Sequence, residues 1–173
     1  MVAKAETALD ELQAKVRPLE EAMAQVERRL DELQGQLRAV RERLAAVETR
    51  ALDLGRDMRH QRHALNELRH KLKKHDALLR EIDPERAPRE YERLVQDRED
   101  LRVKLERAGQ ALETLHAQYE QALEEELRLL GEEWELEQEL DHLRARYETL
   151  LKRVTRLAQG LERRVRDARA RHF

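Results

Sequence analysis

The chain has 173 residues, of which 42% are charged and 3% aromatic, and its formal net charge is −2. It contains five glycines, three prolines, no cysteine and no serine. This composition favours long solvated helices over a globular enzyme core, and it excludes disulfides, thiolate zinc sites, and cysteine or serine nucleophiles. We therefore expect an all-α, non-enzymatic protein with no catalytic residues and no cofactor.

The distribution of apolar residues also bears on the compartment. The first residues lack the apolar segment of a signal peptide, and nowhere does the chain carry the ~18 consecutive apolar residues that a membrane span requires. These features predict a cytoplasmic protein with no membrane association.

The first half of the chain repeats an apolar residue at alternating intervals of three and four from Leu9 to Ile82. This spacing is typical of a coiled-coil seam and predicts a helix over about residues 5–82. Gln61 and His75 occupy two seam positions, where polar residues more often set the register of helix pairing than perform chemistry. Pro18 predicts a kink or a fresh helix start within this segment.

Two prolines mark a turn after the first helix. Asp83-Pro84 and Ala87-Pro88 each disfavour helix at the residue before proline, so the first helix should end near Ile82. Pro88 suits the first turn of a second helix over about residues 89–171, where the seam resumes at Tyr91. The sequence therefore predicts one domain over residues 1–173, a long antiparallel two-helix coiled-coil hairpin with its tip at 83–88.

A bulky apolar stripe interrupts the second seam. Glu126 and Glu133 occupy seam positions there, while the stripe lies on the neighbouring face and consists of Leu123, Leu127, Leu130 and Trp134. Folding the chain back places this stretch opposite roughly residues 39–54, which include several small residues. We expect a local repacking in which large side chains face small ones; the alternative is an exposed apolar groove that docks another helix.

The tip segment resembles a known family. A proline about twenty residues into the first helix, a basic run before the tip and an acidic return helix are similar to the coiled-coil hairpin of the bacterial C4-type zinc-ribbon proteins. Their tip typically carries proline or asparagine followed by Lys-Glu-Leu/Tyr-Glu-Ala-Leu, and the matching residues here are Pro88, Arg89, Glu90, Tyr91, Glu92 and Leu94. The resemblance implies an adaptor or chaperone-like scaffold with links to nucleic acid and to transcription or secretion machinery. The family's paired Cys-x-x-Cys motifs are absent, so the ribbon has been lost or lies outside this stretch.

Charge is segregated along the chain despite the small net value. Basic bands at 56–74 and 144–171 flank an acidic band at 120–139. Sequence-independent nucleic-acid binding would use the basic bands as phosphate contacts, with candidate residues Arg56, Arg59, Arg62, Arg69, Lys71, Lys73, Lys74, Arg163, Arg164 and Arg166. The isoelectric point of about 6.4 and the lack of stacking aromatics favour a solvated, salt-bridged surface instead.

One cluster has metal-ligand spacing. His60, His63, Glu67 and His70 fall on outward heptad positions, where an exposed helix without supporting partners usually holds solvated side chains. We expect no metal site.

The leading functional hypothesis is a scaffold or adaptor that presents its tip to protein partners through Arg89, Glu90, Tyr91 and Leu94. The alternative is nucleic-acid binding by the basic bands, and a third reading is an arm of a larger SMC-like ATPase. The same heptads could also pair two hairpins into a homodimer.

Overall fold

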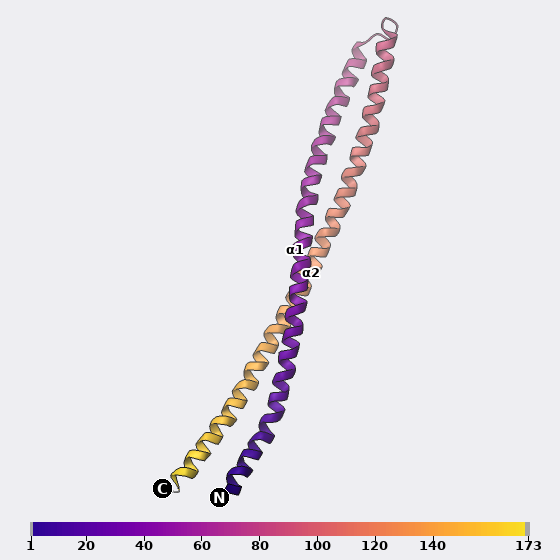
Figure 1. Cartoon of the computed structure of the whole chain (residues 1–173). Helices are drawn as coiled ribbons and strands as arrows, with labels where there is room; N and C mark the ends of the chain where they lie inside the picture. The colour runs from indigo at the N-terminus through magenta and orange to yellow at the C-terminus, as the bar shows by residue number, and fades with distance from the viewer. Residues whose placement is uncertain (1, 172–173) are drawn as a thin grey trace. The chain divides into compact units, whose positions relative to one another are not determined.

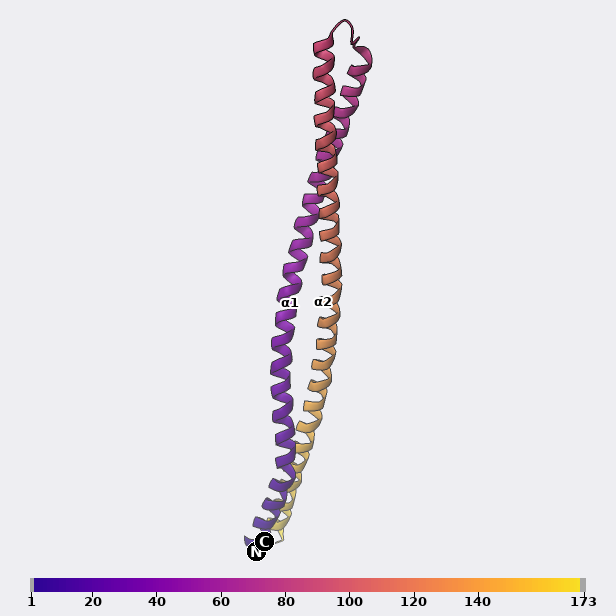
Figure 2. The same cartoon turned by 90° about the vertical axis from the view of Figure 1, so that its right-hand side faces the viewer.

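The computed structural model describes residues 2–171, with the side chains of residue 3 and residues 6–171. It contains two α-helices, α1 (Val2–Glu81) and α2 (Pro88–Ala170), which pack antiparallel and are joined by a short turn (Figures 1 and 2). The described residues contain no strand. The predicted fold, an all-α antiparallel two-helix coiled-coil hairpin, is confirmed.

The turn lies where the two prolines predict it. The Asp83 side chain closes it, because Oδ1 accepts a hydrogen bond from the Glu85 backbone N–H at 3.0 Å. The Asp83 carbonyl accepts a second from the Ala87 N–H at 3.1 Å, and the Ala87 carbonyl accepts the N–H of Tyr91 at 3.0 Å. The missing N–H of Pro88 costs nothing at the first position of α2, and Glu90 places a negative charge near the positive helix end.

The described chain divides into two compact units. The terminal unit combines the residues up to Glu42 with those from Leu130 onward, and the tip unit is Arg43–Leu129. Each unit contains one stretch of α1 packed against one stretch of α2.

Leucines form the core of the terminal unit. Leu33 is fully buried and packs with the buried residues Leu37 and Leu140, and Leu30, Leu136 and Leu143 pack against this cluster. Ion pairs cross the seam on either side, from Arg29 to Glu139 at 3.0 Å and from Arg41 to Glu137 at 2.9 Å. Apolar burial therefore holds this part of the seam together, with exposed ion pairs along its edges.

Pro18 lies inside α1 without interrupting it. The helix runs from Val2 to Glu81, so the fresh helix start that Pro18 suggested does not occur. Proline still lacks an N–H, and the carbonyl four residues earlier, that of Ala14, loses its usual intrahelical donor. The exposed position of Pro18 leaves that carbonyl open to water.

In the tip unit the core thins toward the turn. Buried side chains extend as far as Leu65 on α1 and Ala108 on α2, and none of the described residues between 66 and 107 is buried. Polar contacts cross the seam in this unit. Gln61 donates from Nε2 to the Ala108 carbonyl at 3.3 Å, and Arg98 Nε lies 2.7 Å from Asp76 Oδ1.

The apolar stripe does not repack inward. In the tip unit the seam residues Ala122 and Leu129 are buried, whereas Leu123 and Leu127 are exposed. In the terminal unit Leu140 is buried and Leu130 and Trp134 are exposed. The expected local repacking is therefore wrong. The seam keeps its heptad phase because Ala122, Leu129 and Leu140 already fill it.

Candidate functional site

The first turn of α2 brings the predicted tip residues together. Arg89 and Glu90 are exposed, and Tyr91 and Leu94 are half-buried. The short turn holds this segment in place through Asp83, whose carboxylate accepts the Glu85 N–H and has Arg86 Nε 3.7 Å away. The site therefore offers two opposite charges beside a half-buried aromatic ring, and it contains no nucleophile or acid–base pair.

The four stripe residues are all available to a partner. Leu123 and Leu127 are 38% and 69% exposed in the tip unit, and Leu130 and Trp134 are 41% and 62% exposed in the terminal unit. Single exposed apolar side chains are common on protein surfaces, but several close together in sequence are characteristic of interaction surfaces.

Sequence reasoning missed a further exposed leucine. Leu52 of α1 is 71% exposed and lies outside the seam. Three residues later Gly55 faces Tyr119 of α2, and a methyl group added at Gly55 would lie 3.9 Å from the tyrosine ring. The only indication in the sequence was that Leu52 falls outside the heptad positions of the seam.

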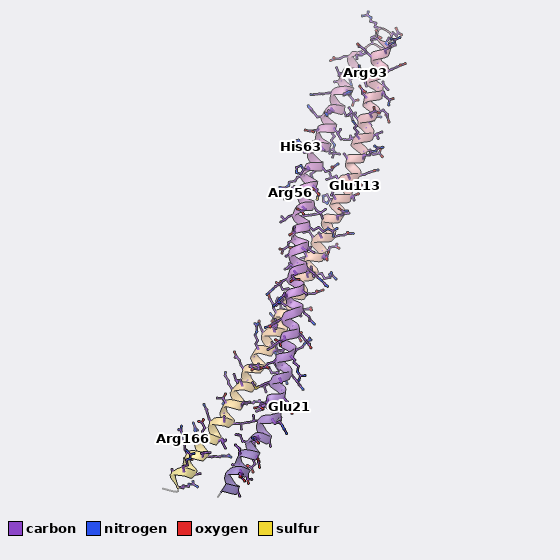
Figure 3. The ribbon with its side chains drawn as sticks, viewed as in Figure 1. Glu21, Arg56, His63, Arg93, Glu113 and Arg166 are labelled. Carbon is purple, nitrogen blue, oxygen red and sulfur yellow. The ribbon has the colours of Figure 1, made fainter. Side chains whose placement is uncertain are left out.

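The basic bands are exposed. All ten candidate phosphate contacts are exposed, and Arg56 and Arg166 lie on the outer surfaces of their helices (Figure 3). Within residues 2–171, none of the ten has a carboxylate oxygen within 4.0 Å. These ten cations therefore do not form the salt bridges that the composition favoured.

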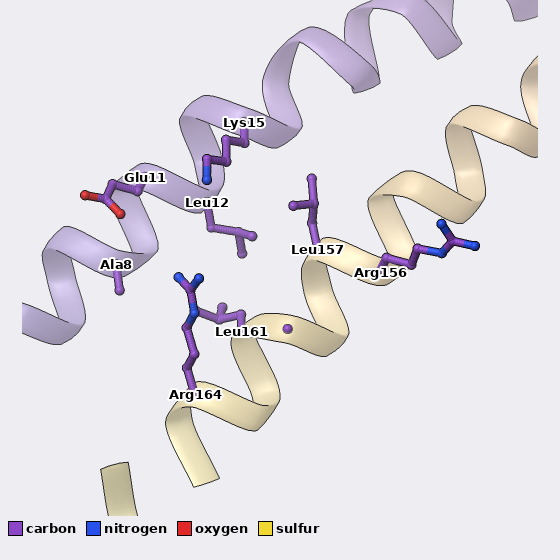
Figure 4. Close-up of a pocket in the computed structure, with 9 residues that line it drawn as sticks. Ala8, Glu11, Leu12, Lys15, Arg156, Leu157, Leu161 and Arg164 are labelled. Atoms are coloured by element: carbon purple, nitrogen blue, oxygen red, sulfur yellow. The ribbon is translucent and has the colours of Figure 1, made fainter. Parts of the chain in front are cut away.

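A small hollow of about 100 Å³ lies between the helices of the terminal unit. Leu12, Leu157 and Leu161 line it, and Arg164 extends from α2 toward α1 (Figure 4). Arg164 is therefore oriented differently from the outward Arg166. The lining contains Glu11 and cations but no second acid and no nucleophile, so it has the composition of a packing gap.

Two groups in the terminal unit have shifted pKa values. Hydrogen bonds to Glu139 and then Glu32 raise the pKa of the Arg29 guanidinium. The Tyr147 hydroxyl donates to Glu27 Oε1 at 2.8 Å, and this hydrogen bond, followed by partial desolvation, raises the pKa of Tyr147. Both shifts stabilise the protonated forms. The contacts with Glu139 and Glu27 join the two helices, whereas Glu32 lies one turn from Arg29 on α1.

The predicted histidine cluster includes one close contact. His63 Nε2 lies 3.1 Å from Glu67 Oε1, but among the described residues no three His, Cys, Asp or Glu side chains are placed to hold an ion.

Among residues 2–171, neither helix has a stretch long and apolar enough to cross a bilayer. A scan against protein-family models and searches of curated proteins and of solved structures each found no match.

Proposed function

We propose that this protein is a non-enzymatic scaffold or adaptor whose hairpin tip is recognised by protein partners. The observation that carries the proposal is the tip itself. Arg89 and Glu90 are exposed on the first helical turn after a closed loop, beside the half-buried Tyr91. A rigid turn lowers the entropy lost when a partner binds, because the contacting residues are already in place.

The sequence of the tip supports the same role. Residues 88–94 are similar to the tip segment of the C4-type zinc-ribbon proteins, which resemble adaptors or chaperone-like scaffolds. We extend only the hairpin-borne part of that role to this chain, since no cysteine is present to build the ribbon.

The test is affinity capture from source-cell lysate with the full chain, with and without nuclease. The first variant combines Arg89→Ala with Glu90→Ala. Its matched control combines Glu106→Ala with Arg107→Ala, an adjacent pair of exposed opposite charges farther along α2. We expect specific proteins that survive nuclease to be lost with the tip variant and retained with the control. Equal capture by both variants would remove the tip from the proposal.

A second variant combines Arg89→Ala with Tyr91→Ala to include the aromatic ring. Because Tyr91 is half-buried, its truncation also removes packing at the start of the seam. Circular dichroism of this variant should show unchanged helicity, so that a loss of capture can be assigned to the tip surface. A loss of capture that tracks a loss of helicity would assign Tyr91 to packing alone.

The alternative function is sequence-independent nucleic-acid binding, favoured by the ten exposed candidate cations of the two bands, none of which has a carboxylate oxygen within 4.0 Å among the described residues. Each band is tested separately, by Lys73→Gln with Lys74→Gln for the first and Arg163→Gln with Arg166→Gln for the second. Binding to a labelled duplex should weaken steeply with added salt, and a variant that removes phosphate contacts should flatten that slope. Absent or salt-independent binding would reject this function.

A further inference from the structure

The outward face of α1 in the tip unit carries a row of charged and titratable side chains. Its six members follow one another at intervals of four and three residues and therefore share one helix face: Arg56, His60, His63, Glu67, His70 and Lys74. All six are exposed, whereas the seam residues Met58 and Leu65 of the same stretch are buried. Figure 3 shows Arg56 and His63 on the side of α1 away from α2. We call this set the histidine row.

The permanent charges of the histidine row nearly cancel. Arg56 and Lys74 contribute two positive charges, and among the described residues neither has a carboxylate oxygen within 4.0 Å. Glu67 contributes one negative charge, so the row has a net charge of +1 while its three histidines are neutral, and +4 when all three are protonated. Elsewhere in residues 56–74, five further cations accompany one further acid, Asp57. Histidine gains its charge in the mildly acidic range, so acidification makes this face strongly cationic.

The acid in the row is coupled to the same titration. His63 Nε2 lies 3.1 Å from Glu67 Oε1. A protonated imidazole at that distance donates a charge-assisted hydrogen bond to the carboxylate and offsets its negative charge. Protonation of His63 therefore neutralises the one acid of the row, while His60 and His70 add positive charges on either side of it.

The groups of α2 do not oppose this change. The contacts of Gly55 with Tyr119 and of Asp76 with Arg98 place residues 98–119 level with the row, on the other side of α1. The four acids of that stretch are matched by four cations, and within residues 2–171 none of those acids has an oxygen within 4.0 Å of a histidine in the row. The charged and titratable residues of the stretch are Arg98, Glu99, Asp100, Arg102, Lys104, Glu106, Arg107, Glu113 and His116.

A long cationic row without apolar side chains suits a phosphate backbone. At a rise of ~1.5 Å per residue, the row extends about 27 Å along α1. A nucleic-acid duplex carries one negative charge per ~1.7 Å of its axis, so phosphates of a single duplex can face the whole row. A helix that binds a lipid surface inserts apolar side chains on its bound face, and the histidine row contains none. Nucleic acid is therefore the better match.

We propose that protonation of the histidine row strengthens the binding of a nucleic-acid duplex to the basic band at 56–74, so that binding is tighter in mildly acidic than in neutral solution. This inference rests on the nucleic-acid function proposed above and adds a regulation of its first band. It does not involve the tip residues.

The test uses the full chain and a labelled duplex, with fluorescence anisotropy measured over a series of salt concentrations at about pH 7.5 and about pH 5.5. At the lower pH we expect tighter binding, and the slope of log affinity against log salt should steepen by about 0.9 for each histidine that gains a phosphate contact. The variant that combines His60→Gln, His63→Gln and His70→Gln should lose this steepening. The control, His116→Gln, alters an exposed histidine of α2 in the same unit and should retain it.

A second variant tests the acid of the row. Glu67→Gln should tighten duplex binding at about pH 7.5 more than Glu106→Gln does. Both changes remove one negative charge from an exposed position of the tip unit, but Glu106 lies on α2 outside the row. Equal effects of the two variants would contradict contact between the duplex and the row.

The outcomes separate this inference from the function on which it rests. Salt-sensitive binding that steepens equally in the triple histidine variant would overturn the role of the histidine row and leave the nucleic-acid function in place. Absence of duplex binding at both pH values would overturn both. Equally tight binding to vesicles that contain phosphatidylserine would overturn the assignment to nucleic acid.

Discussion

The terminal unit and the tip unit contain the same two helices, and each has one fully buried leucine, Leu33 and Leu129, but their seams differ away from these residues. In the terminal unit the fully buried Leu33 lies in a leucine cluster, and ion pairs cross the seam at Arg29 and Arg41. In the tip unit, burial ends at Leu65 and Ala108, and the seam toward the turn carries the Asp76–Arg98 pair. The difference shows that a continuous heptad pattern does not imply even packing.

Uneven packing has consequences for dynamics. Segments with few buried apolar contacts open at a lower free energy than the segments around a packed core. The seam near the tip should therefore open before the leucine cluster does. The leucine cluster of the terminal unit should keep its helices paired after the seam near the tip has opened.

The largest expected effect comes from removing a fully buried leucine, in contrast to a half-buried seam residue near the tip. Leu33→Ala should lower the free energy of unfolding by about 2–5 kcal/mol, because a fully buried leucine leaves a cavity. Leu72→Ala, at a half-buried seam position near the tip, should cost about 1 kcal/mol. Urea denaturation followed by circular dichroism measures both. Equal losses would contradict the contrast in packing.

The terminal unit also contains a destabilised helical turn, because Pro18 donates no hydrogen bond to the Ala14 carbonyl. Pro18→Ala should restore the hydrogen bond to the Ala14 carbonyl and stabilise the surrounding turns by about 3 kcal/mol. Hydrogen exchange of the backbone amides in residues 8–17 should slow accordingly. Gln36→Ala, at an exposed position of the same helix, is the control and should change little. Unchanged exchange in Pro18→Ala would mean that the helical turn around residue 18 is open with or without the proline.

The Asp76–Arg98 pair tests the polar character of the tip unit. Arg98 Nε is buried and makes no hydrogen bond despite its 2.7 Å approach to the carboxylate. Asp76→Ala should cost about 1 kcal/mol by leaving the cation without its counter-charge, a modest value because both side chains are about one-third exposed. Arg98→Leu should be neutral or stabilising, since an apolar seam residue needs no partner. Similar losses in both variants would show that the pair itself stabilises the seam.

The smallest effect concerns the edge of the terminal unit. Because Glu27 raises the pKa of Tyr147, the folded form holds the phenol proton more tightly than the unfolded chain does. The contact therefore contributes stability below the ordinary tyrosine pKa of about 10, and this contribution is lost as pH rises through the higher folded pKa. Ultraviolet absorbance titration should show a late-ionising tyrosine that disappears in Tyr147→Phe and ionises earlier in Glu27→Gln. A titration that Glu27→Gln leaves unchanged would remove this contact from the seam.

Much of the fold followed from local pattern. The alternation of three and four predicted the helices because it aligns apolar residues on one face, and Pro84 and Pro88 predicted the turn because they restrict the residues before them. The continuity of α1 through Pro18 was less accessible, since the local penalty of proline competes with the packing of the whole helix.

The candidate surfaces were only partly accessible from sequence. The tip residues could be named from their position after the prolines, and the stripe from its displacement off the seam. The sequence did not show whether Leu127 would be exposed, because the seam could have shifted to include it. In the structure Ala122 and Leu129 fill the interior, so the seam does not shift. Leu52 carried too little signal by itself, because a single leucine outside a heptad is ordinary.

The sequence by itself determined two helices, a turn at the prolines and a seam of known phase, because these depend on residues near one another in the chain. Only the tertiary structure decided which residues of α1 meet which residues of α2, and hence that Gly55 faces Tyr119 and that Asp76 pairs with Arg98. A heptad repeat is compatible with several registers, so side-chain size and charge across the seam select one.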